Sequence, residues 1–241
     1  MKNKKKKNFL LEKKNDYIIY IHSLVIRTES YKSSLKEAID KLEDFIKNEK
    51  LKNKNIKESE IKVDYKIYNN FRKRLMGDEG YLYNLIGDGQ KSAISYFKFR
   101  SIIKKRKSNN SLGFEIRDIE ENVEKHLKEM NRFRNWANHV PESLLVSEME
   151  LIKEDGINYE IKGDIVIYNF RYCSLEYMIQ LLKESTNIYN IVVEVHQSMK
   201  KDLGSLIGEH IYIKKDYQNI VKGVKSKSNE IARRSLIIQN S

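Results

Sequence analysis

One short stretch of the chain combines residue types that can carry out acid–base chemistry on a phosphate. Arg134, Asn135 and His139 lie just ahead of Pro141, the single proline. A histidine exchanges protons near neutral pH because its unperturbed pKa is about 6.5. An arginine offers a planar set of donors that fits phosphate oxygens. These residues therefore indicate a site at which a base and a charge-stabilising group act together.

The residues before Arg134 predict the element that positions it. Apolar side chains recur at three- and four-residue steps, which predicts an amphipathic helix over residues 115–136. They are Ile116, Ile119, Val123, Leu127, Met130 and Phe133. Arg134 falls on this apolar stripe and is predicted to point inward, whereas Arg132 points roughly to the opposite face. A buried guanidinium is costly when unpaired, so Arg134 needs a carboxylate on another element or a polar groove.

His139 needs a break in the helix if it is to approach Arg134. Five residues correspond to about 140° around a continuous helix, so one straight helix cannot direct both side chains to one point. Pro141 disfavours helical geometry in the residue before it and suits the first turn of a new helix. We therefore predict that the helix ends between Trp136 and Asn138, that His139 lies at a corner, and that a second helix begins at Pro141.

The order Arg134-Asn135-x-x-x-His139 resembles the R-N-x-x-x-H motif of the HEPN superfamily of small helical bundles. The resemblance covers residues 115–155. It implies a homodimer in which the motifs of two subunits share a groove, and a metal-independent endoribonuclease that needs no cofactor. It also implies a toxin or phage-defence effector, controlled by an antitoxin or by another protein or RNA partner.

The same resemblance assigns a role to each residue of the motif. His139 is expected to take the proton from a ribose 2′-hydroxyl, which then attacks the adjacent phosphorus. Arg134 is expected to stabilise the developing charge, and Asn135 to orient one of its donors. The products then carry 2′,3′-cyclic phosphate ends.

Other interpretations of these residues stay open. Arg134 fits equally a structural arginine paired with a distant acid, and His139 a corner residue that bonds a free carbonyl. The protein is then a non-catalytic module that binds RNA or a protein partner, or a basic helical scaffold. Cys173 has no base near it in sequence and suits a small apolar residue better than a nucleophile. No set of histidines, cysteines and acids has the spacing of metal ligands.

Composition favours a polyanionic partner. The chain has 241 residues, with 46 Lys and Arg against 34 Asp and Glu, a formal net charge of +12. Such a balance promotes phosphate contacts and counterion release, although lysine runs are often solvated faces. The clustered basic residues expected to contact RNA are Lys4, Lys5, Lys6, Lys7, Lys104, Lys105, Arg106 and Lys107. Without a long apolar run or a secretory signal, and with a lone cysteine, we expect no membrane contact and a cytoplasmic protein.

The pattern along the chain predicts a mostly α protein, a HEPN-like helical bundle with a small β-hairpin insertion. Residues 1–15 are expected to form a flexible basic arm, residues 16–215 a single helical domain, and residues 216–241 a basic C-terminal helix or tail. Within the domain we expect further helices over residues 16–50, 60–75 and 90–105. The hairpin is expected at residues 157–168, followed by a long helix that Ser174 caps and that ends near Gly204.

Overall fold

A computed structural model describes residues 11–138, 146, 149–150 and 169–214 of the chain. The chain divides into two compact units. The larger unit, residues 11–210, contains all the elements discussed below. The smaller unit comprises residues 1–10 and 211–241, of which residues 211–214 are described and carry neither helix nor strand.

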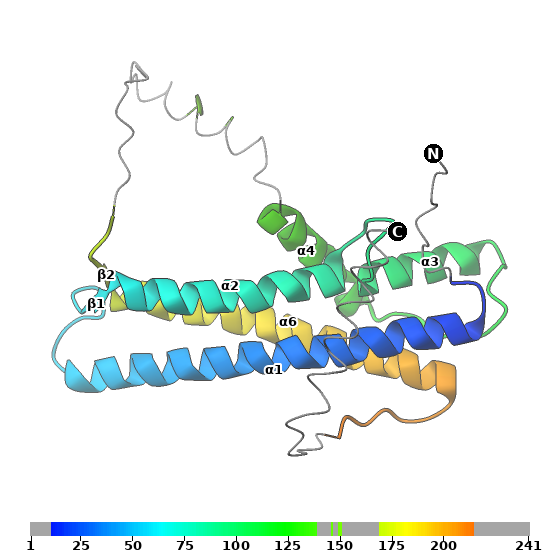
Figure 1. The fold of residues 1–241 in the computed structure, drawn as a ribbon, viewed down its shortest axis with the longest axis horizontal. Coiled ribbons are helices and arrows are strands. Elements are labelled where there is room, and N and C mark those ends of the chain that lie inside the picture. The colour runs from blue at the N-terminus through cyan, green and yellow to red at the C-terminus, as the bar shows by residue number, and fades with distance from the viewer. Residues whose placement is uncertain (1–10, 139–145, 147–148, 151–168, 215–241) are drawn as a thin grey trace, which may run out of the picture. The chain divides into compact units, whose positions relative to one another are not determined.

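The larger unit is mostly helical, as the periodicity predicts. Its described helices are α1 (Lys14–Lys52), α2 (Tyr65–Gly87), α3 (Tyr96–Ser108), α4 (Glu121–Asn138) and α6 (Leu175–Ile207). The long helix α1 packs against both α2 and α6, and α4 packs mainly against α2 (Figure 1). Among the described residues no helix is long and apolar enough to span a membrane.

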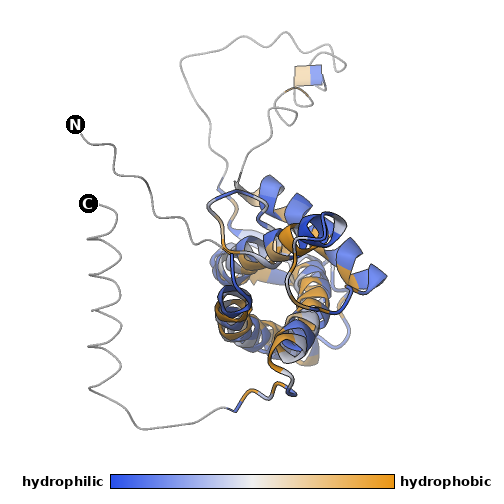
Figure 2. Cartoon of the chain, turned by 90° about the vertical axis from the view of Figure 1, so that its right-hand side faces the viewer, coloured by the Kyte–Doolittle hydropathy of each residue, from blue (hydrophilic) through white to orange (hydrophobic). Residues whose placement is uncertain are grey.

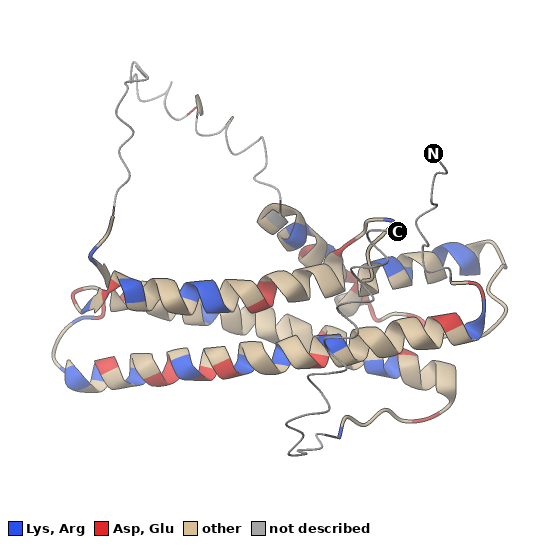
Figure 3. Ribbon diagram, in the orientation of Figure 1, with Lys and Arg blue, Asp and Glu red and all other residues tan. Residues whose placement is uncertain are grey.

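The core lies where the apolar stripes of the three longest helices meet. Seen end-on, these helices turn their hydrophobic residues toward one another (Figure 2). Ile21, Leu24 and Leu35 of α1 are fully buried, as are Leu82 of α2 and Val195 of α6. Basic and acidic residues are interspersed along α1 (Figure 3), so this helix does not carry charges of a single sign.

A two-stranded sheet, which the sequence did not predict, joins distant parts of the chain. Strands β1 (Lys62–Asp64) and β2 (Tyr172–Ser174) pair antiparallel, with Val63 opposite Cys173. Asp64 then caps α2 by accepting a hydrogen bond from the amide of Lys66 at 2.7 Å. The sheet therefore fixes the start of α2 beside the start of α6.

Two of the predicted helices have different bounds in the structure. The helix expected over residues 60–75 is α2, which begins only after β1 and continues through Gly77 and Gly80 to Gly87. A glycine costs a helix about 1 kcal/mol relative to alanine, and the buried Leu82 and Ile86 extend the apolar stripe beyond both glycines. The helix expected over residues 90–105 is α3, which begins at Tyr96 because Ser95 is extended and caps it.

The helix that carries Arg134 also begins later than predicted. Residues 115–120 are not helical, and α4 starts at Glu121. Ile116 is nevertheless buried, and the carbonyl of Arg117 accepts a hydrogen bond from Arg100 instead of joining a helix. The described part of α4 extends to Asn138, so the predicted end between Trp136 and Asn138 stays a prediction.

The last long helix, α6, lies where the sequence predicts it, but its capping and its end differ from the prediction. Ser174 is the N-cap residue of α6, yet its side chain makes no capping hydrogen bond. The helix ends at Ile207 rather than near Gly204, and Gly208 follows in the left-handed conformation with φ of 81°. Glycine favours this conformation because it has no Cβ.

Several predictions lie wholly or partly outside the described residues. They concern His139, the helix from Pro141, the hairpin at 157–168, Lys4 to Lys7 and the segment 216–241. The last part of the expected arm is described: Leu11 is buried and α1 begins at Lys14. Residues 11–15 therefore belong to the larger unit and not to a flexible arm.

A buried charge cluster ties α3 and the segment before α4 to α6. Asp202 is fully buried and forms ion pairs with Arg100 and with Arg117, the latter at 2.8 Å from Nε. The hydroxyl of Tyr96 donates to the same carboxylate at 2.7 Å. Burying charges is tolerable only with such pairing, so this cluster fixes how α3 lies on α6.

A buried histidine makes the stability of the larger unit sensitive to acid. Nε2 of His196 donates to the carbonyl of Val25 at 3.0 Å, and Nδ1 faces Lys32 at 3.3 Å and Glu29 at 3.5 Å. Burial, reinforced by Lys32, lowers the pKa of His196 to about 4. The unfolded chain therefore takes up this proton near pH 6.5, while the folded chain does not.

We expect His196 to make the folded state less stable as the pH falls below 6.5. A histidine with a lowered folded pKa loses stability on acidification, here by about 2 kcal/mol between pH 7 and pH 5. Urea unfolding at both pH values measures it, with His196→Asn as the reference that lacks the group. An equal loss in the variant and the parent contradicts the assignment.

Candidate functional site

Arg134 lies in the last turns of α4 and points into the larger unit, as its position on the apolar stripe predicts. Arg134 is only 8% exposed. Nη2 lies 3.2 Å from Oδ2 of Asp88, and Nη1 donates to Oδ1 of Asn135 at 3.1 Å. The buried Nε has no hydrogen-bond partner among the residues that the structure describes. Both terminal nitrogens of the guanidinium are thus paired, whereas Nε is buried and unpaired among the described residues.

The end of α2 brings Asp88 to this guanidinium. Gly87 is packed so closely on α4 that a Cβ there would lie 2.5 Å from the carbonyl carbon of Met130. Asn131 fixes the contact, because its Nδ2 donates to the carbonyl of Gly87 at 2.6 Å. Only glycine permits this approach of the two backbones. Asp88, the C-cap of α2, is thereby placed beside Arg134.

The loop between α2 and α3 holds Asp88 in place. Oδ1 of Asp88 accepts from the amide of Gln90 at 2.9 Å, and its carbonyl accepts from the hydroxyl of Ser95. The amide of Ser95 donates to the hydroxyl of Tyr20 at 2.9 Å. Burial, with the charge of Asp88 adding to it, raises the pKa of Tyr20 to about 12. Tyr20 therefore stays a neutral hydrogen-bonding group and is not a base for this site.

A groove between α2 and α4 opens beside the motif. It has a volume of about 880 Å³ and is lined by Met76, Tyr83, Phe133 and Trp136 together with Lys125, Lys128 and Arg132. The ring of Trp136 is 68% exposed, whereas Phe133 packs on Tyr83 at 5.6 Å. Glu79 and Glu129 line the groove as well, so apolar, basic and acidic side chains share it.

His139 follows directly after the last described residue of α4, Asn138. Its predicted role lies outside the described residues. The structure therefore gives the positions of Arg134 and Asn135 and brings Asp88 to them. We did not predict from the sequence that Asp88 is the partner of Arg134, although the need of a buried arginine for a distant carboxylate indicated that such a partner exists.

Comparison with protein-family models, with curated proteins and with solved structures finds no match to this chain.

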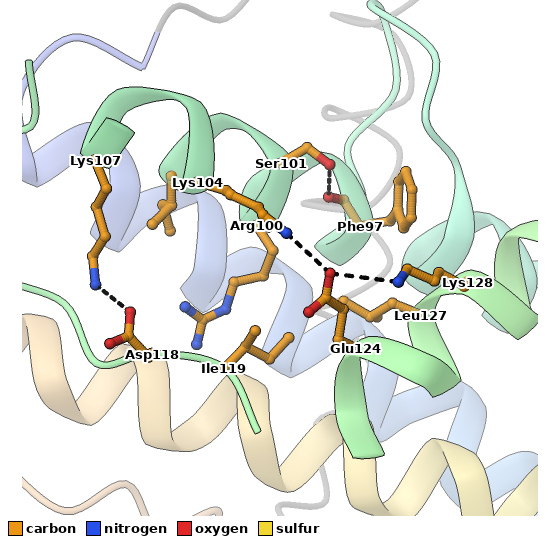
Figure 4. A pocket seen from close by; sticks show the side chains of 11 residues that line it. Phe97, Arg100, Ser101, Lys104, Lys107, Asp118, Ile119, Glu124, Leu127 and Lys128 are labelled. Atoms are coloured by element: carbon orange, nitrogen blue, oxygen red, sulfur yellow. Dashed lines mark hydrogen bonds and ion pairs between the residues drawn. The ribbon is translucent and has the colours of Figure 1, made fainter. Parts of the chain in front are cut away.

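The described basic cluster near the end of α3 is engaged with acidic neighbours. Lys104 pairs with Glu124 at 3.2 Å, and Lys107 pairs with Asp118 at 2.6 Å. Figure 4 shows these pairs around a pocket of about 380 Å³, with Lys128 also directed to Glu124. Exposed pairs of this kind contribute little stability, so a phosphate can displace the carboxylates at small cost.

The two other members of the cluster differ from these lysines. Arg106 lies over the ring of Tyr17, 5.6 Å from its centroid, and donates to its hydroxyl. Lys105 is exposed and forms no ion pair with any described residue. The four residues therefore do not form a single free cationic surface, and their contact with RNA stays a prediction.

The described part of the chain offers no support for a metal site or for a cysteine nucleophile. No group of three or more metal-ligating side chains lies together there. Burial raises the pKa of the Cys173 thiol, which disfavours the thiolate that a nucleophile needs.

Proposed function

We propose that this protein is a metal-independent endoribonuclease in which Arg134 and His139 act together on RNA. The observation that carries the proposal is the guanidinium of Arg134, which is turned into the protein beside the end of α4. There it is held by Asp88 and Asn135 and keeps a buried Nε without a partner among the described residues. His139 is the fifth residue after it in the sequence and follows the last described residue of α4.

The proposed reaction is an attack of the ribose 2′-hydroxyl on the adjacent phosphorus. His139 takes the hydroxyl proton, the new P–O bond closes a 2′,3′-cyclic phosphate, and the bond to the 5′-oxygen breaks. Arg134 balances the charge that develops on the phosphate oxygens. Asn135 orients the guanidinium through Oδ1, which accepts from Nη1 at 3.1 Å.

The ion pair between Asp88 and Arg134 has a different meaning in two interpretations of the protein. In the nuclease, Asp88 positions the guanidinium, and the phosphate accepts hydrogen bonds from the N–H groups that do not bond Asp88 or Asn135. The same ion pair also favours a second candidate, a non-catalytic module in which Arg134 only joins α4 to α2. In that module RNA or a protein partner is bound and no strand is cut.

Cleavage of RNA in the presence of a chelator decides between the two candidates. We expect purified protein to cut single-stranded RNA in excess EDTA and to leave 2′,3′-cyclic phosphate ends, because neither Arg134 nor His139 needs a metal for its role. Mass spectrometry of the products identifies the ends. RNA that is bound but never cut, with or without added divalent ions, assigns the protein to the non-catalytic class.

We further propose that two copies form a symmetric dimer beside the groove between α2 and α4. Trp136 and Met76, which are 68% and 52% exposed, line that groove and supply apolar area for a second copy. Sedimentation at about 50 µM, a concentration that detects a weak dimer, is expected to show a dimer. Trp136→Ser should shift it toward monomer, whereas Ile26→Ser on α1, where the isoleucine is 56% exposed, serves as the control.

In the cell the proposed nuclease acts as a toxin or phage-defence effector held in check by an antitoxin or another regulatory partner. This proposal rests on the resemblance of the motif. Toxicity on expression that requires His139 supports it, and harmless expression of an enzyme that is active on RNA in vitro counts against it.

A further inference from the structure

A second cavity lies at the first turns of α2, at the other end of that helix from Asp88. It has a volume of about 710 Å³. Aromatic side chains from α2, β2, α6 and the segment before β2 line it, namely Tyr65, Tyr68, Phe170, Tyr172 and Tyr177. The ring centroids of Tyr65 and Phe170 lie 5.7 Å apart, and those of Tyr68 and Tyr177 lie 6.4 Å apart. We call this site the aromatic pocket.

The small sheet assembles the aromatic pocket from distant parts of the sequence. Asp64 of β1 pairs with Tyr172 of β2, and the amide of Tyr65 donates to the carbonyl of Arg171 at 3.1 Å. These contacts place the start of α2 beside residues 170–177. The three-residue strands contribute little to the core, and their clearest effect is to bring the rings together.

The rings are unusually open to solvent for their size. Phe170 is 64% exposed, Tyr177 is 59% exposed and Tyr172 is 48% exposed. Leaving so much aromatic area in water forgoes about 25 cal/mol for each Å² that a partner could cover. An exposed apolar patch that is also hollow is typical of a binding site.

The charges around the aromatic pocket select the kind of ligand. Lys62 and Arg72 line it, both are exposed, and neither forms an ion pair with a described residue. Arg171 lies nearby, 5.3 Å over the ring of Tyr172. Glu60 is the one acid among the lining residues. This balance disfavours a cationic ligand and favours a planar group that carries negative charge.

We infer that the aromatic pocket binds an unpaired base of single-stranded RNA, with Arg72 and Lys62 contacting the flanking phosphates. Aromatic rings that stack on bases beside basic side chains are how proteins hold single strands without strong sequence preference. The hydroxyls of Ser59 and Ser174 line the same cavity and can bond base edges. The inference deepens the proposed function, on which its biological meaning rests, by giving the RNA a second contact far from Arg134.

The length of α2 sets the size of RNA that reaches both sites. The helix has 23 residues, which corresponds to about 34 Å at 1.5 Å per residue. A stacked strand advances about 3.4 Å per nucleotide, so about ten nucleotides separate the aromatic pocket from the Arg134 site. RNA of about 16 nucleotides should therefore be cut more efficiently than RNA of about six.

Binding of a 2′-O-methyl oligouridylate of 16 nucleotides tests the inference in the full chain. This RNA has no free 2′-hydroxyl, so binding is measured without cleavage. We expect Tyr177→Ala and Tyr177→Leu to bind about 5- to 100-fold more weakly, the range for losing one stacked base. Tyr81→Ala is the matched control, because Tyr81 is 56% exposed and stacked on Tyr31 at 4.5 Å outside the aromatic pocket.

A second measurement covers the case in which a variant is destabilised. Photocrosslinks from 4-thiouridine in the same RNA should map to residues 59–72 and 170–177 of the unaltered protein. Unchanged affinity in folded Tyr177→Ala, or crosslinks only elsewhere, overturns the inference and leaves the aromatic pocket to a protein or peptide. The proposed nuclease can fail independently of this site. RNA binding that depends on Tyr177 without any cleavage refutes only the nuclease. RNA cleavage together with binding that does not depend on Tyr177 refutes only the aromatic pocket as an RNA site.

Discussion

Replacing His139 by alanine is expected to slow RNA cleavage by about two to four orders of magnitude, the usual contribution of a general base. Folding should be unaffected, because the proposal gives His139 a role in the reaction and none in stability. Initial rates on a 16-nucleotide RNA and thermal unfolding of the same sample measure the two properties. A folded His139→Ala protein that cleaves like the parent refutes the proposed active site.

Arg134 requires a more careful substitution than His139. Arg134→Ala leaves the carboxylate of Asp88 buried without its partner, which costs about 3–5 kcal/mol when a buried pair is broken in this way. Arg134→Lys keeps the charge but loses the planar set of donors, so it should stay folded and still lose about 10²- to 10³-fold in rate. Arg27→Ala, which changes an exposed arginine of α1 that lines neither the groove nor the aromatic pocket, is the control and should cleave normally.

Asp88→Asn separates a catalytic arginine from a structural one. Asparagine retains an acceptor for Nη2, so the nuclease should keep more activity in Asp88→Asn than in Arg134→Lys. If Arg134 only joins α4 to α2, neither variant has any cleavage to lose, and both differ from the parent in stability alone. The pair of variants therefore tests the role of the ion pair as well as the reaction.

The direction of Arg134 was predictable from sequence, but its partner was not. Spacing from Val123, Leu127 and Met130 is local information, and it correctly placed the guanidinium on the buried side of α4. Asp88 lies 46 residues away, in a Gly-Asp-Gly turn. Its approach depends on the contact between Gly87 and α4, which is a property of the folded chain and leaves no periodic signal.

The difference between local and long-range information also explains which elements of the fold were predicted correctly. The helices α1 and α6 follow from long apolar stripes, so their positions were predicted well. The strands β1 and β2 have three residues each and are stabilised by pairing with one another across the chain, so no local pattern indicates them. The start of α4 was misplaced because Ile116 is apolar and buried without being helical.

Removing the carboxylate of Asp202 is expected to destabilise the larger unit strongly. Asp202→Ala leaves Arg100 and Arg117 without the anion that both contact. Breaking a buried ion pair costs about 3–5 kcal/mol because an uncompensated charge is left behind. Urea unfolding at pH 7 measures the change. Asp118→Ala is the control, since it removes an ion pair with Lys107 in which the aspartate is 92% exposed, and such pairs contribute little.

A combined variant then tests why the Asp202 cluster matters. If the penalty arises from uncompensated charge, replacing all three charges with Arg100→Met, Arg117→Met and Asp202→Leu should cost less than Asp202→Ala alone. If the hydrogen bonds of Tyr96 and Ser198 to these groups dominate instead, the triple variant should be the least stable. Because Arg100 lies on α3 and Arg117 just before α4, either outcome shows how strongly α6 holds the elements that lead to Arg134.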